Sequence, residues 1–290
     1  MNSIIIVNYK VPDLLKQCIR SIYEAQSSES FEIFVIDNAS GDNSKEIIMS
    51  HFPEVIWIQN RRNIGFSRAV NAGINASNGK FIILLNPDTR IYPGAFEAVS
   101  EFFMQNPQTG IIGGKIINPD GSVQPQCRRN IPKPRAAFMR LFGISRLFPS
   151  LPSSRQYELP SEALDSPQKV EAISGAFMCI KREVIDTIGL FDGNFFLYGE
   201  DLDYCYRATQ KGFDIFYLPT ASVVHVRGAS RKKYPVRILF YTHHAMARFY
   251  HKHLASDHFF LFNSMIYLTI WMRWIAMIVI TSFTESIRRK

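Results

Sequence analysis

The chain has 290 residues, of which 47% are hydrophobic and 20% charged. This composition is typical of a globular protein with a sizeable core, and it excludes a disordered chain. The net charge of +8 is uneven, because residues 1–120 carry 10 Lys or Arg against 12 Asp or Glu, whereas the remainder carries 23 against 13. This excess indicates a basic face toward nucleic acid, anionic lipid or a phosphorylated substrate.

The four cysteines are far apart in the sequence and form no Cys-x-x-Cys pair; they are Cys18, Cys127, Cys179 and Cys205. We expect reduced, mostly structural thiols of a cytosolic domain, and neither a disulfide framework nor a zinc site. The apolar run at residues 4–7 is too short for the core of a signal peptide. The catalytic part is therefore expected to stay in the cytosol.

Short apolar runs alternate with helix-forming segments over the first 104 residues. We expect strands at residues 3–9, 31–36, 55–58 and 81–85. We expect helices that begin at Pro12 and after Asn43 or Ser44, and two more at residues 66–76 and 93–104. Such βαβ units predict an α/β fold with a Rossmann-like, mostly parallel sheet flanked by helices.

Polar side chains follow three of these strands. They are Asn8 and Tyr9 after the first strand, Asp37 and Asn38 after the second, and Asn86, Pro87 and Asp88 after the fourth. Because Pro87 cannot donate to a sheet, the fourth strand stops there and places Asp88 at the carboxyl edge, where open α/β sheets bind ligands. A carboxylate at this edge can hold Mg²⁺ or Mn²⁺ against a phosphate, although Asn, Pro and Asp are also common turn residues.

A turn with two arginines, residues 60–65, precedes the helix at residues 66–76. A glycine before a helix N-terminus, with arginine nearby, suits a diphosphate group. Each feature alone is also typical of a capped turn. Their joint placement at one edge of the sheet is much harder to attribute to turns, and it favours a ligand site.

Four motifs resemble the inverting family 2 glycosyltransferases, most closely the bacterial rhamnosyltransferase-type branch. They are Val7-Asn8-Tyr9, Val35-Ile-Asp-Asn-Ala-Ser-Gly-Asp42, Asn63-Ile-Gly-Phe-Ser-Arg-Ala-Val-Asn71 and Leu85-Asn-Pro-Asp88. The resemblance runs from about Ser3 to His253 and implies a GT-A-type nucleotide-sugar domain. It implies that Asp37 contacts the base and that Asp88 ligates Mg²⁺ or Mn²⁺ through the donor diphosphate. It also implies donor contacts by Asn8, Tyr9, Asn38, Asn63, Gly65, Phe66, Asn71, Asn86 and Pro87.

One departure from the family concerns the metal. The family's Asp-x-Asp is here Asn86-x-Asp88, and Asn86 is a weaker, neutral ligand. The metal would then depend on one carboxylate and on a ligand elsewhere in the chain.

Residues 121–157 contain no acidic residue. Basic side chains stand there among large apolar ones, and they include Arg128, Arg129, Lys133, Arg135, Arg140 and Arg146. A solvated loop explains this pattern, and so does a surface for an anionic membrane or a lipid-linked diphosphate. The sequence offers no recognisable nucleic-acid-binding module, so nucleic acid is not an expected partner.

Residues 170–180 predict a strand that is interrupted at Ser174 and Gly175. Glycine within a strand marks a bulge or a close approach by another group. In the family this strand lies beside the bound sugar, so Gly175 would clear space for the donor.

Three carboxylates open the helix that follows residue 199: Glu200, Asp201 and Asp203. Acids in a first turn favour the helix dipole, but three within four residues also provide a route to a general base with a raised pKa. Inverting glycosyl transfer needs one such base, which removes the acceptor proton as the hydroxyl oxygen attacks the anomeric carbon. The resemblance assigns this role to Asp201 and places Glu200 at the donor site. Asp203 and Arg207, four residues apart, are expected to pair.

Two further strands are expected at residues 214–218 and 222–226. His225 lies in the second, and a lone histidine in an apolar strand is usually a core residue. The family pattern instead has a metal-ligating histidine at this place, so that His225 with Asp88 would complete the metal site. Arg227 then stands where the family often has a glycine.

The C-terminal part is apolar and basic. Residues 238–254 mix aromatic and basic side chains at helical spacing, and residues 259–283 form an apolar run broken by Asn263 and Arg273. The run is long enough to span a bilayer, while Trp271 and Trp274 favour a helix at the interface. We expect membrane association, either lying on the surface or spanning it, over a soluble core helix.

The sequence therefore divides into a donor-binding half at 1–120, an acceptor and catalytic half of the same domain at 121–235, and membrane-associating helices at 236–290. We expect a metal-dependent, inverting glycosyltransferase at the cytoplasmic face of a bacterial plasma membrane. It would move a sugar, L-rhamnose from dTDP-rhamnose or a sugar from a UDP donor, to a lipid-linked or polysaccharide acceptor. The alternatives are a degenerate binding protein and a sugar-nucleotide nucleotidyltransferase. A homo-oligomer is left open.

Overall fold

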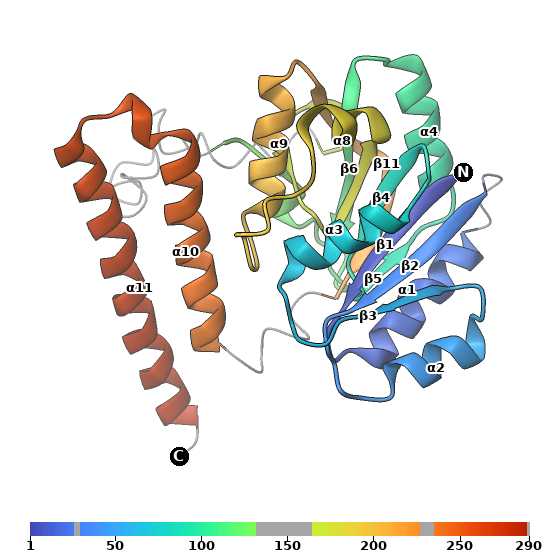
Figure 1. Ribbon diagram of the computed structural model, residues 1–290, viewed down its shortest axis with the longest axis horizontal. Helices are drawn as coiled ribbons and strands as arrows, with labels where there is room; N and C mark the ends of the chain where they lie inside the picture. The colour runs from blue at the N-terminus through green and yellow to red at the C-terminus, as the bar shows by residue number, and fades with distance from the viewer. Residues whose placement is uncertain (26–29, 132–163, 227–234, 289–290) are drawn as a thin grey trace.

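The structure is a computed structural model that describes residues 1–25, 30–131, 164–226 and 235–288. Five of the basic residues discussed above lie outside these ranges: Lys133, Arg135, Arg140, Arg146 and Arg227. The described residues form a central sheet with helices packed on it, and a pair of long C-terminal helices that stand beside this domain (Figure 1).

The first half of the sheet is parallel, in the order β3-β2-β1-β4. Its strands are β1 (Asn2–Asn8), β2 (Phe31–Asp37), β3 (Ile56–Gln59) and β4 (Phe81–Leu85). β1 and β4 are buried at every position, as expected for apolar runs covered on both faces. The helices between these strands are α1 (Pro12–Glu24), α2 (Ser44–His51) and α3 (Phe66–Ala76).

The second half of the chain adds strands to the same sheet. Beyond β4 the order continues β10-β6-β11-β5, with β8 paired to β11. These strands are β5 (Thr89–Ile91), β6 (Thr109–Ile117), β8 (Gln168–Lys169), β10 (Phe177–Lys181) and β11 (Asp214–His225). The helices are α4 (Ala95–Gln105), α8 (Arg182–Ile188) and α9 (Glu200–Gln210). The predicted α/β class, a sheet flanked by helices, is confirmed.

The sheet is mixed, because β10 runs antiparallel to both of its neighbours, β4 and β6. Phe177 at the start of β10 pairs with Leu85 at the end of β4. The chain therefore enters β10 at the edge where β4 ends. This reversal brings Gly175 to the edge that the sequence predicts as the ligand site.

Three predicted strands differ from the structure. The segment 170–180 divides into β9 (Ala172–Ile173), which pairs with β7 (Arg128–Arg129) in a separate two-stranded sheet, and β10 in the main sheet. The break falls at the predicted interruption. Conversely, residues 214–225 form the single strand β11, with a register shift between Leu218 and Ser222.

The C-terminal helices α10 (Pro235–His253) and α11 (Phe260–Arg288) run antiparallel, side by side (Figure 1). Short 3₁₀ turns lie at Pro125–Cys127 and Ala255–Asp257. Ala245 and Phe249 of α10 belong to the main hydrophobic core, whereas Ile266 and Ile270 of α11 form a small separate cluster with Tyr250. Residues Phe260–Ser282 of α11 are long and apolar enough to cross a membrane, and 17% of their most apolar stretch is buried.

Candidate active site

Asp37 lies at the carboxyl edge of the sheet and is almost fully buried. Asn8, its partner in the register of β1 and β2, donates from Nδ2 to Asp37 Oδ1 at 2.7 Å. Asp37 Oδ2 accepts from the backbone N–H of Ser40 at 2.9 Å and from Gln59 Nε2 at 2.8 Å. Both oxygens are therefore held by the protein, and Asp37 organises the ends of three neighbouring strands. Its contact with a base stays a prediction.

Asn38 fixes the turn that leads into α3. Its Nδ2 donates to the carbonyl of Gly65 at 3.2 Å, and its Oδ1 accepts from Asn60 Nδ2 at 3.0 Å. Asn63 Oδ1 accepts from the N–H of Gly65 at 3.0 Å. Gly65 has φ +86°, and a Cβ there would stand 2.7 Å from the carbonyl oxygen of Phe196, so this position requires glycine.

Helix α3 holds the loop that precedes α9. The N–H of Phe66 donates to the carbonyl of Phe196 at 2.7 Å, and Ser67 Oγ donates to that of Phe195 at 2.6 Å. The amide of Asn71 donates to the carbonyl of Phe191 at 2.8 Å and accepts from its N–H at 3.0 Å. Asn71, predicted as a donor contact, therefore clamps this loop in the structure.

Asp88 and His225 meet at the ends of β4 and β11, as the resemblance implied. Asp88 Oδ1 lies 3.1 Å from His225 Nε2, and Asn86 Nδ2 lies 3.5 Å from the same nitrogen. Gln124 holds the opposite side of the ring, with Oε1 3.1 Å from His225 Nδ1. Its Nε2 donates to the backbone carbonyl of His225 at 3.2 Å.

This arrangement fits part of a divalent metal site. With the Nδ1 proton donated to Gln124, Nε2 of His225 carries the lone pair that a metal ligand needs. A carboxylate oxygen beside it suits Mn²⁺ or Mg²⁺, whose remaining positions are commonly filled by substrate phosphates and water. Within the described ranges, no group of three or more His, Cys, Asp or Glu residues is arranged so that it could hold a metal ion by itself. The protein would thus supply two strong ligands.

Asp201 lies in the first turn of α9 and is held by three donors. Arg129 Nη2 donates to Oδ2 at 2.6 Å, and the backbone N–H of Gly175 donates to the same oxygen at 3.2 Å. The N–H of Leu202 donates to Oδ1 at 2.7 Å. A Cβ at Gly175 would meet Asp201 Cβ at an ordinary 3.6 Å. Packing among the described residues therefore does not require glycine at this position.

A short path of backbone contacts connects Asp88 and His225 to the first turn of α9. The backbone N–H of Asn86 donates to the carbonyl of Ala176 at 3.0 Å, and the neighbouring Gly175 donates to Asp201. Asn86 stands next to Pro87 and two residues before Asp88 in the same strand-end turn. The backbone at Gly175 and Ala176, just before β10, thus contacts both the turn of Asp88 and the side chain of Asp201.

The other two acids of α9 differ in their surroundings. Burial, and then the charge of Asp201, raise the pKa of Glu200 to about 8. Asp203 is fully buried and pairs with Arg207 at 2.9 Å, as predicted, and also with Lys252 and His253 of α10, each at 2.7 Å. Despite the cost of its burial, hydrogen bonds from His253 and Lys252 hold the pKa of Asp203 below its usual value.

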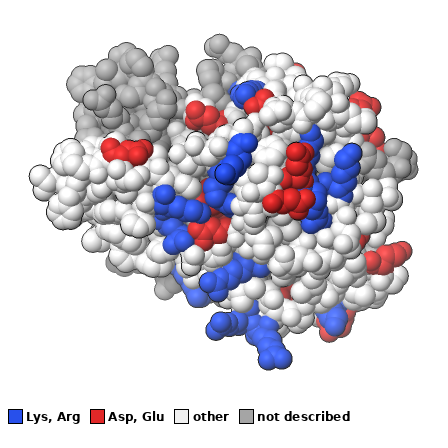
Figure 2. Space-filling view, turned by 45° about the horizontal axis from the view of Figure 1, so that its top comes forward, with Lys and Arg blue, Asp and Glu red and all other residues white. Residues whose placement is uncertain are grey.

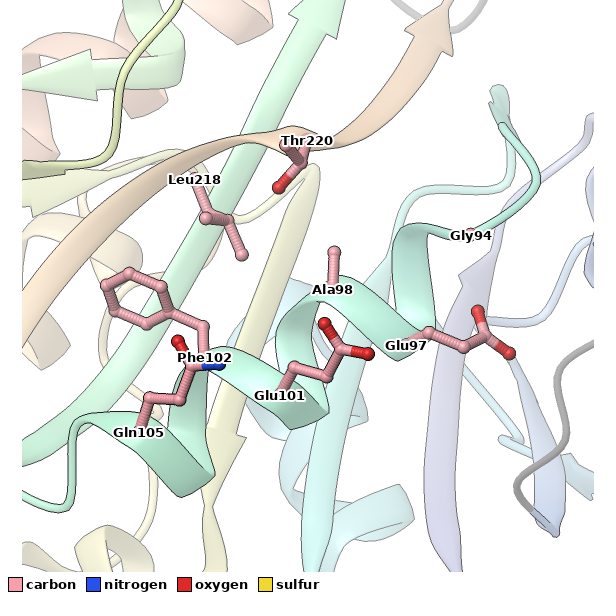
Figure 3. A pocket seen from close by; sticks show the side chains of 8 residues that line it. All are labelled: Gly94, Glu97, Ala98, Glu101, Phe102, Gln105, Leu218 and Thr220. Carbon is pink, nitrogen blue, oxygen red and sulfur yellow. The ribbon is translucent and has the colours of Figure 1, made fainter.

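Sequence reasoning missed Gln124 and Phe196, which contact His225 and Gly65 from distant parts of the chain. Neither residue carries a local signal, because its role depends on packing alone. Tyr9 and Pro87 are half-buried at the ends of β1 and β4. The hollow of Figure 3 is a separate feature between α4 and β11, and none of the predicted site residues lines it.

Comparison with known sequences shows the family. The family model described as glycosyltransferase like family 2 matches residues 2–239. The chain is 27% identical over 245 residues to an N-acetylglucosaminyl-diphospho-decaprenol L-rhamnosyltransferase of Mycobacterium tuberculosis, which covers 80% of this chain and 78% of that protein. It is 29% identical over 229 residues to the low-salt glycan biosynthesis hexosyltransferase Agl10 of Haloferax volcanii, covering 77% of this chain and 66% of that protein.

Solved structures show the same fold. GalNAc-T7 with UDP, GalNAc and Mn²⁺ matches with a TM-score of 0.59 at 18% identity, over 79% of this chain and less than half, 44%, of that one. A mannosyltransferase of Pyrobaculum calidifontis with GDP-Man and Mn²⁺ matches with a TM-score of 0.58 at 14% identity, over 95% of this chain and 74% of that one. These neighbours confirm the GT-A-type fold. Since the family model covers residues 2–239, well over half of the sequence, the chain belongs to glycosyltransferase family 2.

Proposed function

We propose that this glycosyltransferase moves L-rhamnose from dTDP-rhamnose, with inversion at the anomeric carbon, onto a lipid-linked glycan. The reaction belongs to cell-surface glycan synthesis at the cytoplasmic face of a bacterial plasma membrane. The name of the mycobacterial relative supports the sugar and the lipid-linked acceptor, since 80% of this chain aligns with it. A UDP-sugar donor and a polysaccharide acceptor are the nearest alternatives.

The observation that carries the proposal is the position of Asp201 against Gly175. Asp201 is the base in this proposal, and it accepts the acceptor proton as the hydroxyl oxygen attacks the anomeric carbon. Arg129 and the N–H of Gly175 fix the orientation of its carboxylate. Because Gly175 adjoins Ala176, which bonds Asn86, the base stands close along the backbone to the turn that would bind the donor diphosphate.

Asp88 and His225 would hold Mg²⁺ or Mn²⁺. The ion, when bound, would neutralise the charge that develops on the departing diphosphate. Gln124 keeps the His225 ring oriented, and Asn86 contributes its side-chain amide beside that ring. Asp37, Asn8 and Asn38 would shape the floor of the donor site from the ends of β1 and β2.

The test is nucleoside diphosphate release from a panel of nucleotide sugars, with and without lipid-linked acceptors and in the presence of Mg²⁺, Mn²⁺ or a chelator. We expect metal-dependent release from one donor that Asp201→Asn abolishes while donor binding persists. Asp186→Asn, on the exposed side of α8, is the matched control and should keep full activity.

Two outcomes would contradict the proposal. Turnover that survives in Asp201→Asn would remove Asp201 as the base. Donor binding without turnover across a broad acceptor panel would favour a degenerate binding protein, for which the replacement of the family's first aspartate by Asn86 is the supporting feature.

A further inference from the structure

The outward face of α11 is apolar along most of the helix. It exposes the following large side chains: Phe260, Leu261, Met265, Leu268, Met272, Ile275, Val279 and Ile280. Figure 2 shows a broad area with few charged atoms at the left of the molecule, the side on which Figure 1 places α11. A contiguous apolar face of this extent normally marks an interaction surface.

The inward face of α11 is fixed along α10. Tyr250 Oη donates to Asn263 Oδ1 at 2.6 Å near the start of α11. About two and three turns further along α11, Trp271 and Trp274 pack against Phe240 of α10, with ring centres 6.1 and 6.0 Å from that of Phe240. Contacts at both ends of this stretch hold the two antiparallel helices side by side.

Helix α10 is in turn fixed to the catalytic domain by charged groups. Asp192 accepts from Arg248 Nη2 at 2.9 Å and from Lys252 Nζ at 3.0 Å. Asp203, in the acidic helix α9, pairs with Lys252 and with His253. Burial of Phe249 of α10 in the main core adds an apolar contact to these ion pairs.

These contacts bear on whether α11 crosses a bilayer or lies on its surface. If α11 crossed the membrane in this arrangement, α10 would lie at the same depth. Arg248, Lys252 and the Asp192 side chain would then enter the hydrocarbon layer, where charged groups are costly. A helix that lies in the plane of the interface buries its apolar face and leaves α10 and the catalytic domain in water.

We infer that α11 lies along the surface of an anionic membrane, with its outward face in one leaflet, and does not cross it. The inference rests on the membrane association in the proposed function, but not on its donor or acceptor. Residues 235–282 carry four Lys or Arg against one Asp, which suits anionic headgroups. Arg273 is exposed on α11, and its long side chain can reach those headgroups from an interfacial helix.

The first experiment is flotation of the full chain with vesicles of phosphatidylcholine and phosphatidylglycerol. We expect the protein to float with these vesicles, and less with phosphatidylcholine alone. Leu268→Glu combined with Ile275→Glu should abolish flotation, because both side chains lie on the outward face. Met104→Glu, at a 69% exposed apolar residue of α4, is the matched control and should float as the unchanged chain does.

Three results of the flotation experiment would contradict different parts of the inference. If the unchanged chain does not float, the proposed membrane association fails. If the double variant floats normally, the assigned face is wrong. If the unchanged chain forms a dimer that stays with the dense fraction and the double variant is monomeric, the face is an interface between copies of this chain.

The second experiment distinguishes lying from crossing, and it uses a membrane-impermeant maleimide on bacterial spheroplasts that produce the full chain. The four native cysteines are buried, so labelling reports an introduced thiol. Ser264→Cys and Ser282→Cys place exposed thiols near the start of α11 and at the end of its apolar stretch. We expect both to be labelled only after the spheroplasts are lysed. Labelling of Ser282→Cys alone in intact spheroplasts would show that α11 crosses the membrane and would overturn the inference.

Discussion

Glu200 and Asp201 are adjacent in sequence, yet they meet different surroundings. Asp201 receives three hydrogen bonds, whereas Glu200 Oε2 is buried without a hydrogen-bond partner among the described residues. Burial, reinforced by the charge of Asp201, raises the pKa of Glu200 to about 8. At neutral pH the side chain of Glu200 is therefore mostly protonated.

The raised pKa of Glu200 predicts how stability depends on pH. Between the ordinary value of 4.5 and about 8, the folded protein keeps a proton that the unfolded chain releases, so the free energy of unfolding falls as pH rises. Glu200→Gln replaces the carboxyl group with an amide that does not titrate. The stability of the variant relative to the unchanged chain should therefore increase from pH 5 to pH 8. Urea unfolding at both pH values measures this difference.

A matched control for this prediction is Glu183→Gln, at an exposed acid in the first turn of α8. It should follow the unchanged chain at both pH values. Parallel profiles for Glu200→Gln and the unchanged chain would show that Glu200 is already ionised in the folded protein at neutral pH.

At the residue scale, the sequence predicted side-chain pairs where either spacing or a motif pointed to them. Asp203 and Arg207 pair because residues four apart share a helix face. The meeting of Asp88 and His225 followed from the resemblance. The partners Arg129 and Gln124 could not be assigned, because the strands and turns that deliver them are set by long-range packing.

At the scale of elements, the buried strands β1, β2 and β4 were predictable from their continuous apolar runs. Strand β6 was not expected, although it lies inside the sheet. Its sequence contains Gly110, Gly113 and Gly114, which weaken the strand pattern. The structure explains all three, because a Cβ at Gly110 would meet Val184, one at Gly113 would meet Ile173, and one at Gly114 would meet the carbonyl of Ala221.

The clamp between α3 and the loop before α9 yields a prediction at this scale. Asn71→Ala leaves the N–H and carbonyl of Phe191 without their side-chain partner, which should cost roughly 1–3 kcal/mol of stability. The initial rate of transfer should also fall, because the loop leads into the helix of Asp201. Thermal unfolding and nucleoside diphosphate release measure the two effects.

Asn75→Ala is the control, since Asn75 is exposed on the same helix. It should leave stability and transfer nearly unchanged. The experiment also tests the donor contact that the resemblance assigned to Asn71. Weaker donor binding with unchanged stability would favour that contact over the clamp.

At the scale of the molecule, the two predicted halves at 1–120 and 121–235 contribute strands to one sheet. β6 from the first half lies between β10 and β11 from the second. The two C-terminal helices differ in how far they belong to the hydrophobic core of this domain. Ala245 and Phe249 of α10 belong to the main core, whereas the buried residues of α11 pack in their own cluster on Tyr250.

This difference predicts the effect of two truncations. A chain that ends at Asp257 lacks α11 but keeps α10, and we expect it to fold and to transfer sugar to a water-soluble acceptor while losing membrane binding. A chain that ends at residue 234 also loses Phe249 from the core and the partners Lys252 and His253 of the buried Asp203. Removing partners from a buried charge is strongly destabilising, so this shorter chain should unfold at a clearly lower temperature.

Circular dichroism melting of both truncated chains, followed by the transfer assay, measures these effects. The chain ending at Asp257 serves as the control for the shorter one, because the two differ by α10 and the turn after it. Equal melting temperatures would mean that α10 does not stabilise the catalytic domain and that the ion pair with Arg207 alone is enough for the buried carboxylate of Asp203. Loss of folding in both would mean instead that α11 stabilises the catalytic domain through α10, since the two helices share the contacts of Phe240 and Tyr250.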